Sequence, residues 1–223
     1  MTDNLTVIKA CEERIESALW SFEVPGELEE ALAVYREVEN ELDALDISAG
    51  QITYSEVQRV KAYCFLRQGN VLRQTDRAQE ALGVGHRELE AARASGDELT
   101  LARSLMSNGT NLIVAGEIDR GLVMVEESRS LFEAGASDDF RQGLGWYWIL
   151  IADLGNAGLL EAKETDVVHA ADQALEILLP LENWTGIARA YAARAQAYEQ
   201  SGDVAAAAAD RDKQGIFEAK NVS

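Results

Sequence analysis

The chain has 223 residues, of which 47% are hydrophobic, so it is long enough to bury a core of its own. Its 39 acidic residues outnumber its 20 basic residues, and the net charge of −19 opposes binding to nucleic acid and to anionic membrane surfaces. The N-terminal segment is acidic where a signal peptide is basic, and no apolar run is long enough to span a membrane. We therefore expect a soluble cytoplasmic protein.

Helix is predicted almost throughout, because Ala, Leu, Glu and Arg are abundant and only two prolines are present. Five segments share one pattern: a small residue in a first helix, a turn, and a second small residue early in the next helix. The first-helix small residues are Gly69, Gly109, Ala152 and Ala195. Their second-helix counterparts are Ala31, Ala81, Gly121 and Ala207, with Ala162 or Ala171 in the fourth segment.

The turns carry Gly or Asp, which tolerate a left-handed backbone, at Gly26, Asp76, Gly116 and Gly202. Short polar joints with Gly or Pro close the second helices. We expect a single all-α domain over residues 1–223. Its predicted helix pairs span about 5–46, 53–95, 97–136, 138–180 and 184–219.

This pattern resembles the tetratricopeptide repeat in a long-repeat variant, most clearly in QSGDVAAAA at 200–208. The resemblance covers about residues 5–219. It implies a right-handed superhelix, or solenoid, of about five helix-turn-helix repeats whose first helices line a concave groove. Gly121 departs from the usual Ala, and the register of the fourth repeat stays open between Ala162 and Ala171.

Three rows of residues are expected on the groove face of the first helices. Amide, hydroxyl and carboxylate groups suit the backbone of a bound peptide, while arginine and aromatic side chains provide anchors. The alternative is that each row is only the solvated side of its helix. The rows are Asn70, Thr110, Asp153 and Gln196; then Tyr63, Arg103, Trp146 and Arg189; then Arg73, Ile113, Asn156 and Glu199.

A carboxylate-binding variant of this site involves Arg67, Asn70 and Arg73. Some tetratricopeptide proteins hold the C-terminal carboxylate of a peptide with Lys, Arg and Asn side chains on adjacent repeats, and Asn70 matches one such position. Ser107 and Thr110 stand where further residues of that set are needed. The complete set is therefore missing.

Aromatic residues divide between the core and the groove. Three in succession begin at Trp146, after a GLG segment at 143–145 that is expected to be flexible. Consecutive residues point in different directions on a helix, so Trp148 is assigned to the core and Trp146 to the groove. Trp20 and Trp184 are expected to be packing residues.

Charge is unevenly distributed along the chain. Residues 1–50 contain 13 acidic and 3 basic residues, whereas residues 51–100 contain 7 of each. The acidic first repeat either steers a basic or dipolar partner towards the groove or is simply the solvated face of an end repeat.

No catalytic constellation is evident. The segment GVGHRE at 83–88 lies within a predicted helix, so its backbone amides are not available to a phosphate. His86 has no second His or Cys at the sequence spacing of a metal site, and its neighbour Glu88 is interpreted as an ordinary surface acid. Cys11 and Cys64 are expected to be small core residues. We expect no enzymatic activity, no metal and no cofactor.

The preferred function is therefore a non-catalytic interaction module whose groove binds a peptide or a helix of a partner protein. The alternative is a sensor subunit, in which a small molecule or peptide changes the curvature of the superhelix. An enzyme on a solenoid scaffold is a third possibility and would need a polar pocket with perturbed acids and bases. Pairing of two copies into a homo-oligomer stays open.

Overall fold

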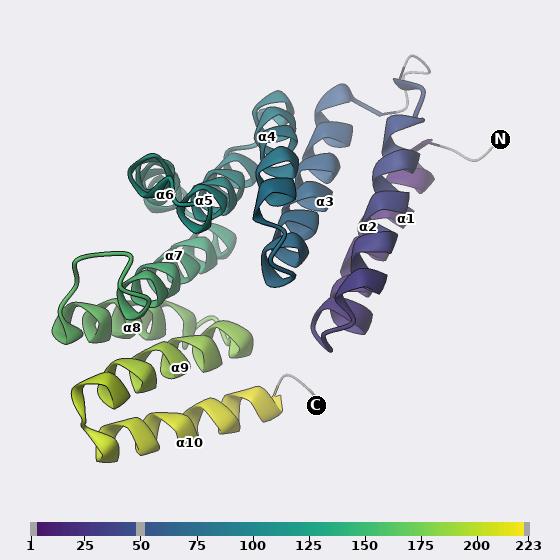
Figure 1. Cartoon of the computed structure of the whole chain (residues 1–223). Coiled ribbons are helices and arrows are strands. Elements are labelled where there is room, and N and C mark those ends of the chain that lie inside the picture. Colours follow the sequence, from purple (N-terminus) through teal and green to yellow (C-terminus); the bar gives the residue numbers. More distant parts are fainter. Residues whose placement is uncertain (1–3, 48–51, 221–223) are drawn as a thin grey trace. The chain divides into compact units, whose positions relative to one another are not determined.

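A computed structural model describes residues 4–47 and 52–220, and all regular secondary structure in them is helical (Figure 1). The predicted all-α class is confirmed, and the helices pack in adjacent pairs. No helix among these residues is both long and apolar enough to cross a membrane. The helices are α1 (Asn4–Ala18), η1 (Leu19–Glu23, a short π-helix), α2 (Leu28–Asp43), α3 (Tyr54–Gln74), α4 (Ala78–Ser95), α5 (Glu98–Val114), α6 (Ile118–Ala134), α7 (Asp138–Asn156), α8 (Glu164–Leu178), α9 (Trp184–Ser201) and α10 (Val204–Lys220).

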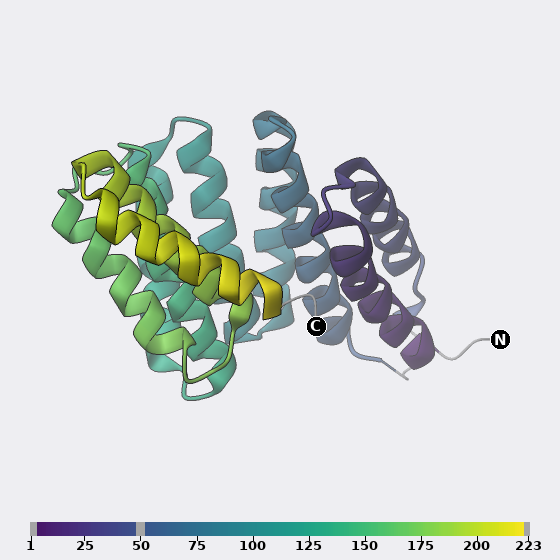
Figure 2. The same cartoon turned by 90° about the horizontal axis from the view of Figure 1, so that it is seen from below.

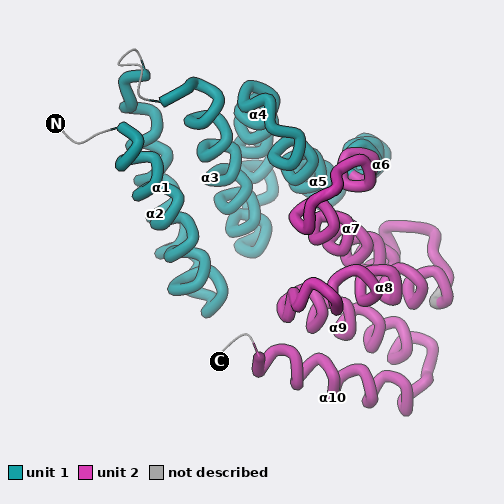
Figure 3. The backbone as a smooth tube through the Cα atoms, turned by 180° about the vertical axis from the view of Figure 1, so that it is seen from behind, with its two compact units in different colours: residues 1–128 teal, residues 129–223 magenta. Residues whose placement is uncertain are grey.

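The chain divides into two compact units, residues 1–128 and 129–223, and the boundary falls within α6 (Figure 3). In the first unit, α3 packs against α4 and α2, and α1, α3 and α5 are neighbours. A continuous apolar core runs from Ile8 to Ala92 and includes Cys11 and Cys64, which are fully buried as predicted. The first helices of this unit therefore lie side by side and share one face.

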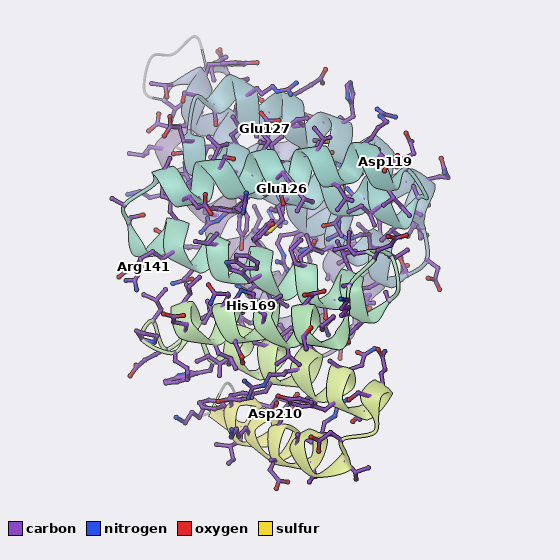
Figure 4. The ribbon with its side chains drawn as sticks, turned by 90° about the vertical axis from the view of Figure 1, so that its left-hand side faces the viewer. Asp119, Glu126, Glu127, Arg141, His169 and Asp210 are labelled. Atoms are coloured by element: carbon purple, nitrogen blue, oxygen red, sulfur yellow. The ribbon has the colours of Figure 1, made fainter. Side chains whose placement is uncertain are left out.

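In the second unit, α9 and α10 lie side by side and α7 contacts both α8 and α9 (Figures 1 and 2). Asp210 of α10, labelled in Figure 4, is buried and accepts two hydrogen bonds from Arg194 of α9, at 2.6 Å from Nε and 2.8 Å from Nη2. Burial is tolerated here because the charge is paired and bonded at both carboxylate oxygens.

Helix starts and turns follow local chemistry. Thr53 and Glu56 form a capping box at the start of α3. Backbone φ is positive at the predicted turn residues, which are Gly26, Asp76, Gly116 and Gly202. In the fourth pair the left-handed residue is Gly158, one position before the residue that the column spacing indicates. The turn there is shifted because α7 ends one residue early relative to the repeat.

The small-residue columns are sites of close helix approach. Gly109, Ala152 and Ala195 are buried in the first helices, and Ala81 is fully buried in α4. In the fourth pair, Ala171 lies fully buried in α8 whereas Ala162 precedes that helix, so Ala171 is the small residue of the second helix.

The GLG segment at 143–145 is not a flexible joint, contrary to the prediction. It lies inside α7, and a Cβ atom on Gly143 would fall 2.2 Å from the ring of Phe132. A Cβ on Gly145 would fall 2.6 Å from Leu178. The two glycines are therefore needed for close packing within a helix.

The acidic first pair is matched to the second pair by ion pairs. Most of the acidic side chains of the first pair are still exposed, so the ion pairs join the two helix pairs at the surface, and the steering interpretation stays a prediction. The pairs are Arg59 with Glu12, Arg67 with Glu23, Lys61 with Asp43, Arg77 with Glu29, Arg87 with Glu39, and Glu80 with Arg36.

An aromatic stack fastens α10 to α9. The ring of Phe217 is nearly parallel to the ring of Trp184 at 5.9 Å and to the ring of Tyr191 at 5.7 Å between centroids. We predict that Phe217→Ala lowers the free energy of unfolding by about 2 kcal/mol, because it removes both ring contacts. Urea titration followed by tryptophan fluorescence measures this.

The matched control is Ile216→Ala, because Ile216 immediately precedes Phe217 in α10 and its side chain is exposed. Its cost is expected to stay below about 0.5 kcal/mol. Equal costs for the two variants would contradict the role of the stack.

Candidate functional site

Four of the predicted groove residues come together on the shared face of α1, α3 and α5 in the first unit. Tyr63, Arg67 and Arg73 lie on α3, and Arg103 lies on α5; all four are half-buried. The charges of Arg67 and Arg103 both act on the Tyr63 hydroxyl, and that of Arg67 acts on Arg73. In a protein of net charge −19, this face brings three arginine side chains together, although the carboxylates of Glu16 and Glu23 also contact it.

Arg67 is committed to a structural ion pair. Its Nε donates to Oε2 of Glu23 at 3.1 Å, and its Nη2 donates to Oε1 of the same carboxylate. The Tyr35 hydroxyl also donates to Oε2 of Glu23, at 2.7 Å. Because Glu23 is buried, its charge is balanced inside the protein by Arg67.

Arg73 is held differently. Its two terminal nitrogens donate to the side-chain oxygens of Asn70 and Asn111, which are both uncharged. Asn111 in turn donates to the carbonyl of Ala81 at 3.3 Å. Burial lowers the pKa of Arg73, and the negative charges of Glu88 and Glu23 act on it in the opposite sense. The guanidinium is therefore oriented by amides rather than neutralised by a contacting carboxylate.

The remaining candidates in this unit have mixed roles. The Tyr63 hydroxyl donates to Glu16 of α1 at 2.6 Å, and burial raises its pKa. The Thr110 hydroxyl donates to the carbonyl of Met106 at 2.8 Å, within its own helix. Tyr63 thus joins α3 to α1, whereas the hydroxyl proton of Thr110 is already used by the backbone.

In the second unit, Asp153 of α7 and Arg189 of α9 form an ion pair at 2.9 Å. Burial raises the pKa of Asp153, and the positive charge of Arg189 opposes that shift. Gln196 is exposed on α9, while Trp146 is half-buried against the apolar core of this unit. The predicted residues here therefore make one ion pair and one exposed amide on neighbouring first helices.

The third predicted row does not hold together as a surface. Ile113 is buried, with its backbone against Gly121 of α6. Asn156 donates to the carbonyl of Ala193 at 2.8 Å, and Glu199 accepts from Arg211 at 2.9 Å. These residues do not form one surface because each first helix is rotated slightly differently about its axis. Equivalent positions therefore lie in the core in one repeat and at the surface in another.

One of the aromatic assignments needs correction, that of Trp20, whereas Trp148 packs against the apolar core of the second unit as predicted. Tyr147 is the buried member of the three consecutive aromatic residues, and Trp146 and Trp148 are half-buried on either side of it. Trp184 packs against the core as predicted. Trp20 does not, because 54% of it is exposed. It lies one helical turn after Glu16, the residue that bonds Tyr63, so it extends the same side of the first pair.

Two residues that carry the site were missed or misassigned. Glu88 is fully buried and is not a surface acid. Its spacing from Val84 and Ala91 places it on the apolar side of α4, and that periodicity is the signal that indicates burial. Asn111 follows Thr110 and is also buried, but no pattern in the sequence marks it as the partner of Arg73.

A separate hollow of about 550 Å³ lies between α2, α3 and α4. Arg36 and Arg87 line it and are paired with Glu80 and Glu39, which line it too. None of the predicted groove residues borders it, and its basic and acidic groups already neutralise one another.

No family model and no curated protein matches the sequence. Among solved structures, the chain is similar to BtubC (BKLC) from P. vanneervenii, with a TM-score of 0.59 and 13% sequence identity. The similarity covers 100% of this chain and 94% of that chain. Because the sequence identity is only 13%, the similarity shows the fold alone. The shared fold agrees with the paired helices described above.

Arginine and asparagine side chains on adjoining helices offer several N–H donors in fixed positions, which suit carboxylate or carbonyl oxygens of a partner. Groups of three or more His, Cys, Asp or Glu residues arranged to hold a metal do not occur in the part of the chain that the structure describes.

Proposed function

We propose that this chain is a non-catalytic protein-interaction module of tetratricopeptide-like construction, which binds a peptide or a helix of a partner protein along its first helices. The observation that carries the proposal is the Arg73 guanidinium, held half-buried on the shared face of α1, α3 and α5 by two amide oxygens. A desolvated guanidinium with neutral partners gains most from an oxygen-bearing, negatively polarised group.

The surroundings of Arg73 favour an extended segment as the ligand. Arg103 and Thr110 lie on the next first helix, and Tyr63 and the exposed Trp20 extend the face in the other direction. Polar side chains beside a large aromatic side chain are typical of surfaces that bind peptides through a few anchors.

The proposal predicts which arginines control binding. Peptides are first selected from a phage-displayed random library on the full chain, and the affinity of the most enriched peptide is measured by fluorescence anisotropy. We expect Arg73→Gln combined with Arg103→Gln to weaken binding at least about tenfold, since a charge-assisted hydrogen bond contributes about 1.5–3 kcal/mol.

The matched control changes two exposed arginines on second helices, Arg93→Gln in α4 and Arg120→Gln in α6. It removes the same charge from the chain, so a general electrostatic effect would appear in both double variants. The control is expected to bind within about twofold of the wild type. Equal losses in both, or no enriched peptide, would refute the proposed face. Thermal melting of each variant checks that the fold is kept.

A further inference from the structure

A buried carboxyl group lies behind Arg73, where α4 packs against α5. Oε2 of Glu88 accepts hydrogen bonds from the Ser107 hydroxyl at 3.1 Å and from Nδ2 of Asn108 at 3.3 Å. Oε1 of Glu88 is buried and has no hydrogen-bond partner among the described residues. A carboxylate surrounded by neutral donors, with one oxygen unbonded, is costly to keep ionised away from water.

One layer of asparagine side chains separates Glu88 from Arg73. Asn108 donates to Glu88, and Asn111 accepts from Arg73. Both asparagines crowd the same point on α4, because a Cβ atom on Gly85 would lie 2.4 Å from Oδ1 of Asn108 and 2.8 Å from Nδ2 of Asn111. Arg73 and Glu88 are therefore bonded to two different asparagine side chains, which both lie beside Gly85.

The charge that acts on Glu88 from the neighbouring elements is that of Arg73 on α3. From α5 it meets uncharged side chains, those of Ser104, Ser107 and Asn108. Arg87, the preceding residue of α4, is paired with Glu39 of α2. Burial raises the pKa of Glu88 to about 8, although Arg73 acts to lower it.

We propose that an anionic group of the partner bound at Arg73 favours the protonated form of the buried Glu88, an inference that rests on the proposed function of this face. The hydrogen bonds of Ser104 and Ser107 and the charge of Arg73 all favour the ionised form of Glu88, and the incoming anion offsets the last of these. The protonated form then persists to higher pH, and binding and protonation strengthen each other. Affinity for an acidic ligand therefore falls as the pH rises through the range in which Glu88 ionises.

The link between the two side chains is tested without any ligand. ¹³C NMR of the full chain labelled at glutamate carboxyl carbons gives the pKa of Glu88, whose signal is assigned by its loss in Glu88→Gln. Arg73→Gln imitates neutralisation and is expected to raise this pKa by at least about half a pH unit. Arg73→Lys keeps the charge, and Arg93→Gln removes an exposed charge elsewhere on α4, so both are expected to leave it nearly unchanged. An equal pKa in all four proteins would overturn the proposal.

Unfolding supplies an independent readout. The pKa of Glu88 is higher in the folded protein than its ordinary value of 4.5, so folding takes up a proton and stability falls as the pH rises from about 4.5 to about 8. Between pH 5.5 and 7.5 the unfolding constant of the wild type is expected to rise about 70-fold more than that of Glu88→Gln. Parallel curves for the two proteins would contradict a protonated, buried Glu88.

Binding is tested with one defined probe, N-acetyl-tetraglutamate, by calorimetry at pH 7 and pH 9. We expect the wild type to bind at least about threefold more weakly at pH 9, and the affinity of Glu88→Gln to be independent of pH. A pH-independent affinity in the wild type would overturn the proton link. Failure of the probe to bind would overturn the proposal that Arg73 receives an anionic group. Binding of a display-selected peptide would, in that case, still support the proposed function of the face.

Discussion

Replacing Gly121 by alanine is expected to lower the free energy of unfolding by about 3 kcal/mol. A Cβ atom at this position would lie 2.5 Å from the carbonyl oxygen of Gly109 and 3.0 Å from the backbone nitrogen of Ile113. Both atoms belong to the backbone of α5, so neither can rotate away as a side chain would. The whole of α5 must instead move from α6. Urea unfolding followed by circular dichroism measures the loss.

The matched control is the same substitution at Gly83 in α4, where a Cβ atom would meet nothing within 4 Å. Alanine is a better helix former than glycine, so Gly83→Ala is expected to raise stability by about 0.5–1 kcal/mol. The two changes should therefore differ in sign. If Gly121→Ala proved neutral or stabilising, α5 and α6 would not approach as closely as the structure indicates.

Removing the guanidinium of Arg67 is the second change with a large expected effect. Arg67→Met leaves the buried carboxylate of Glu23 without its cation, which is expected to cost about 3–5 kcal/mol. Thermal or urea unfolding measures this cost. The double variant Glu23→Gln with Arg67→Met is expected to recover much of the loss, because the uncompensated charge is gone.

The exposed pair of Arg14 with Glu37 and Glu41 provides the control for Arg67. Arg14→Met is expected to cost less than about 1 kcal/mol, because solvent screens that interaction. Equal costs for Arg67→Met and Arg14→Met would show that Glu23 is not the buried partner of Arg67. The comparison also separates Arg67, a candidate for partner binding, from the amide-held Arg73.

Local chemistry explains why the helices were predictable from the sequence. The left-handed turn at Gly116 and the capping box at Thr53 and Glu56 each act within a few residues of chain. The helix pairs follow from these local rules, as does the burial of Cys11 and Cys64. The resemblance to the tetratricopeptide repeat rests on the small-residue columns and stays a prediction about the family.

The polar interactions could not be read in the same way, because they join residues far apart in the sequence. Nothing near Arg67 indicates that Glu23, 44 residues earlier, takes its donors, and nothing near Arg73 indicates Asn111. Three of the residues predicted to bind a partner, Arg67, Arg73 and Arg103, cannot be distinguished from the sequence, because all are arginines on first helices. Only packing distinguishes the ion-paired arginine from the one held by amides.

The sequence by itself determined the all-helical class, the succession of helix pairs and most of the turns, because backbone propensity acts over one or two helical turns. Only the tertiary structure decided that Glu88 is buried behind Arg73 and that Trp20 is exposed. Burial and charge pairing depend on which helices become neighbours and on the rotation of each helix about its axis. The hydrophobic pattern of a helix fixes that rotation only to within a fraction of a turn.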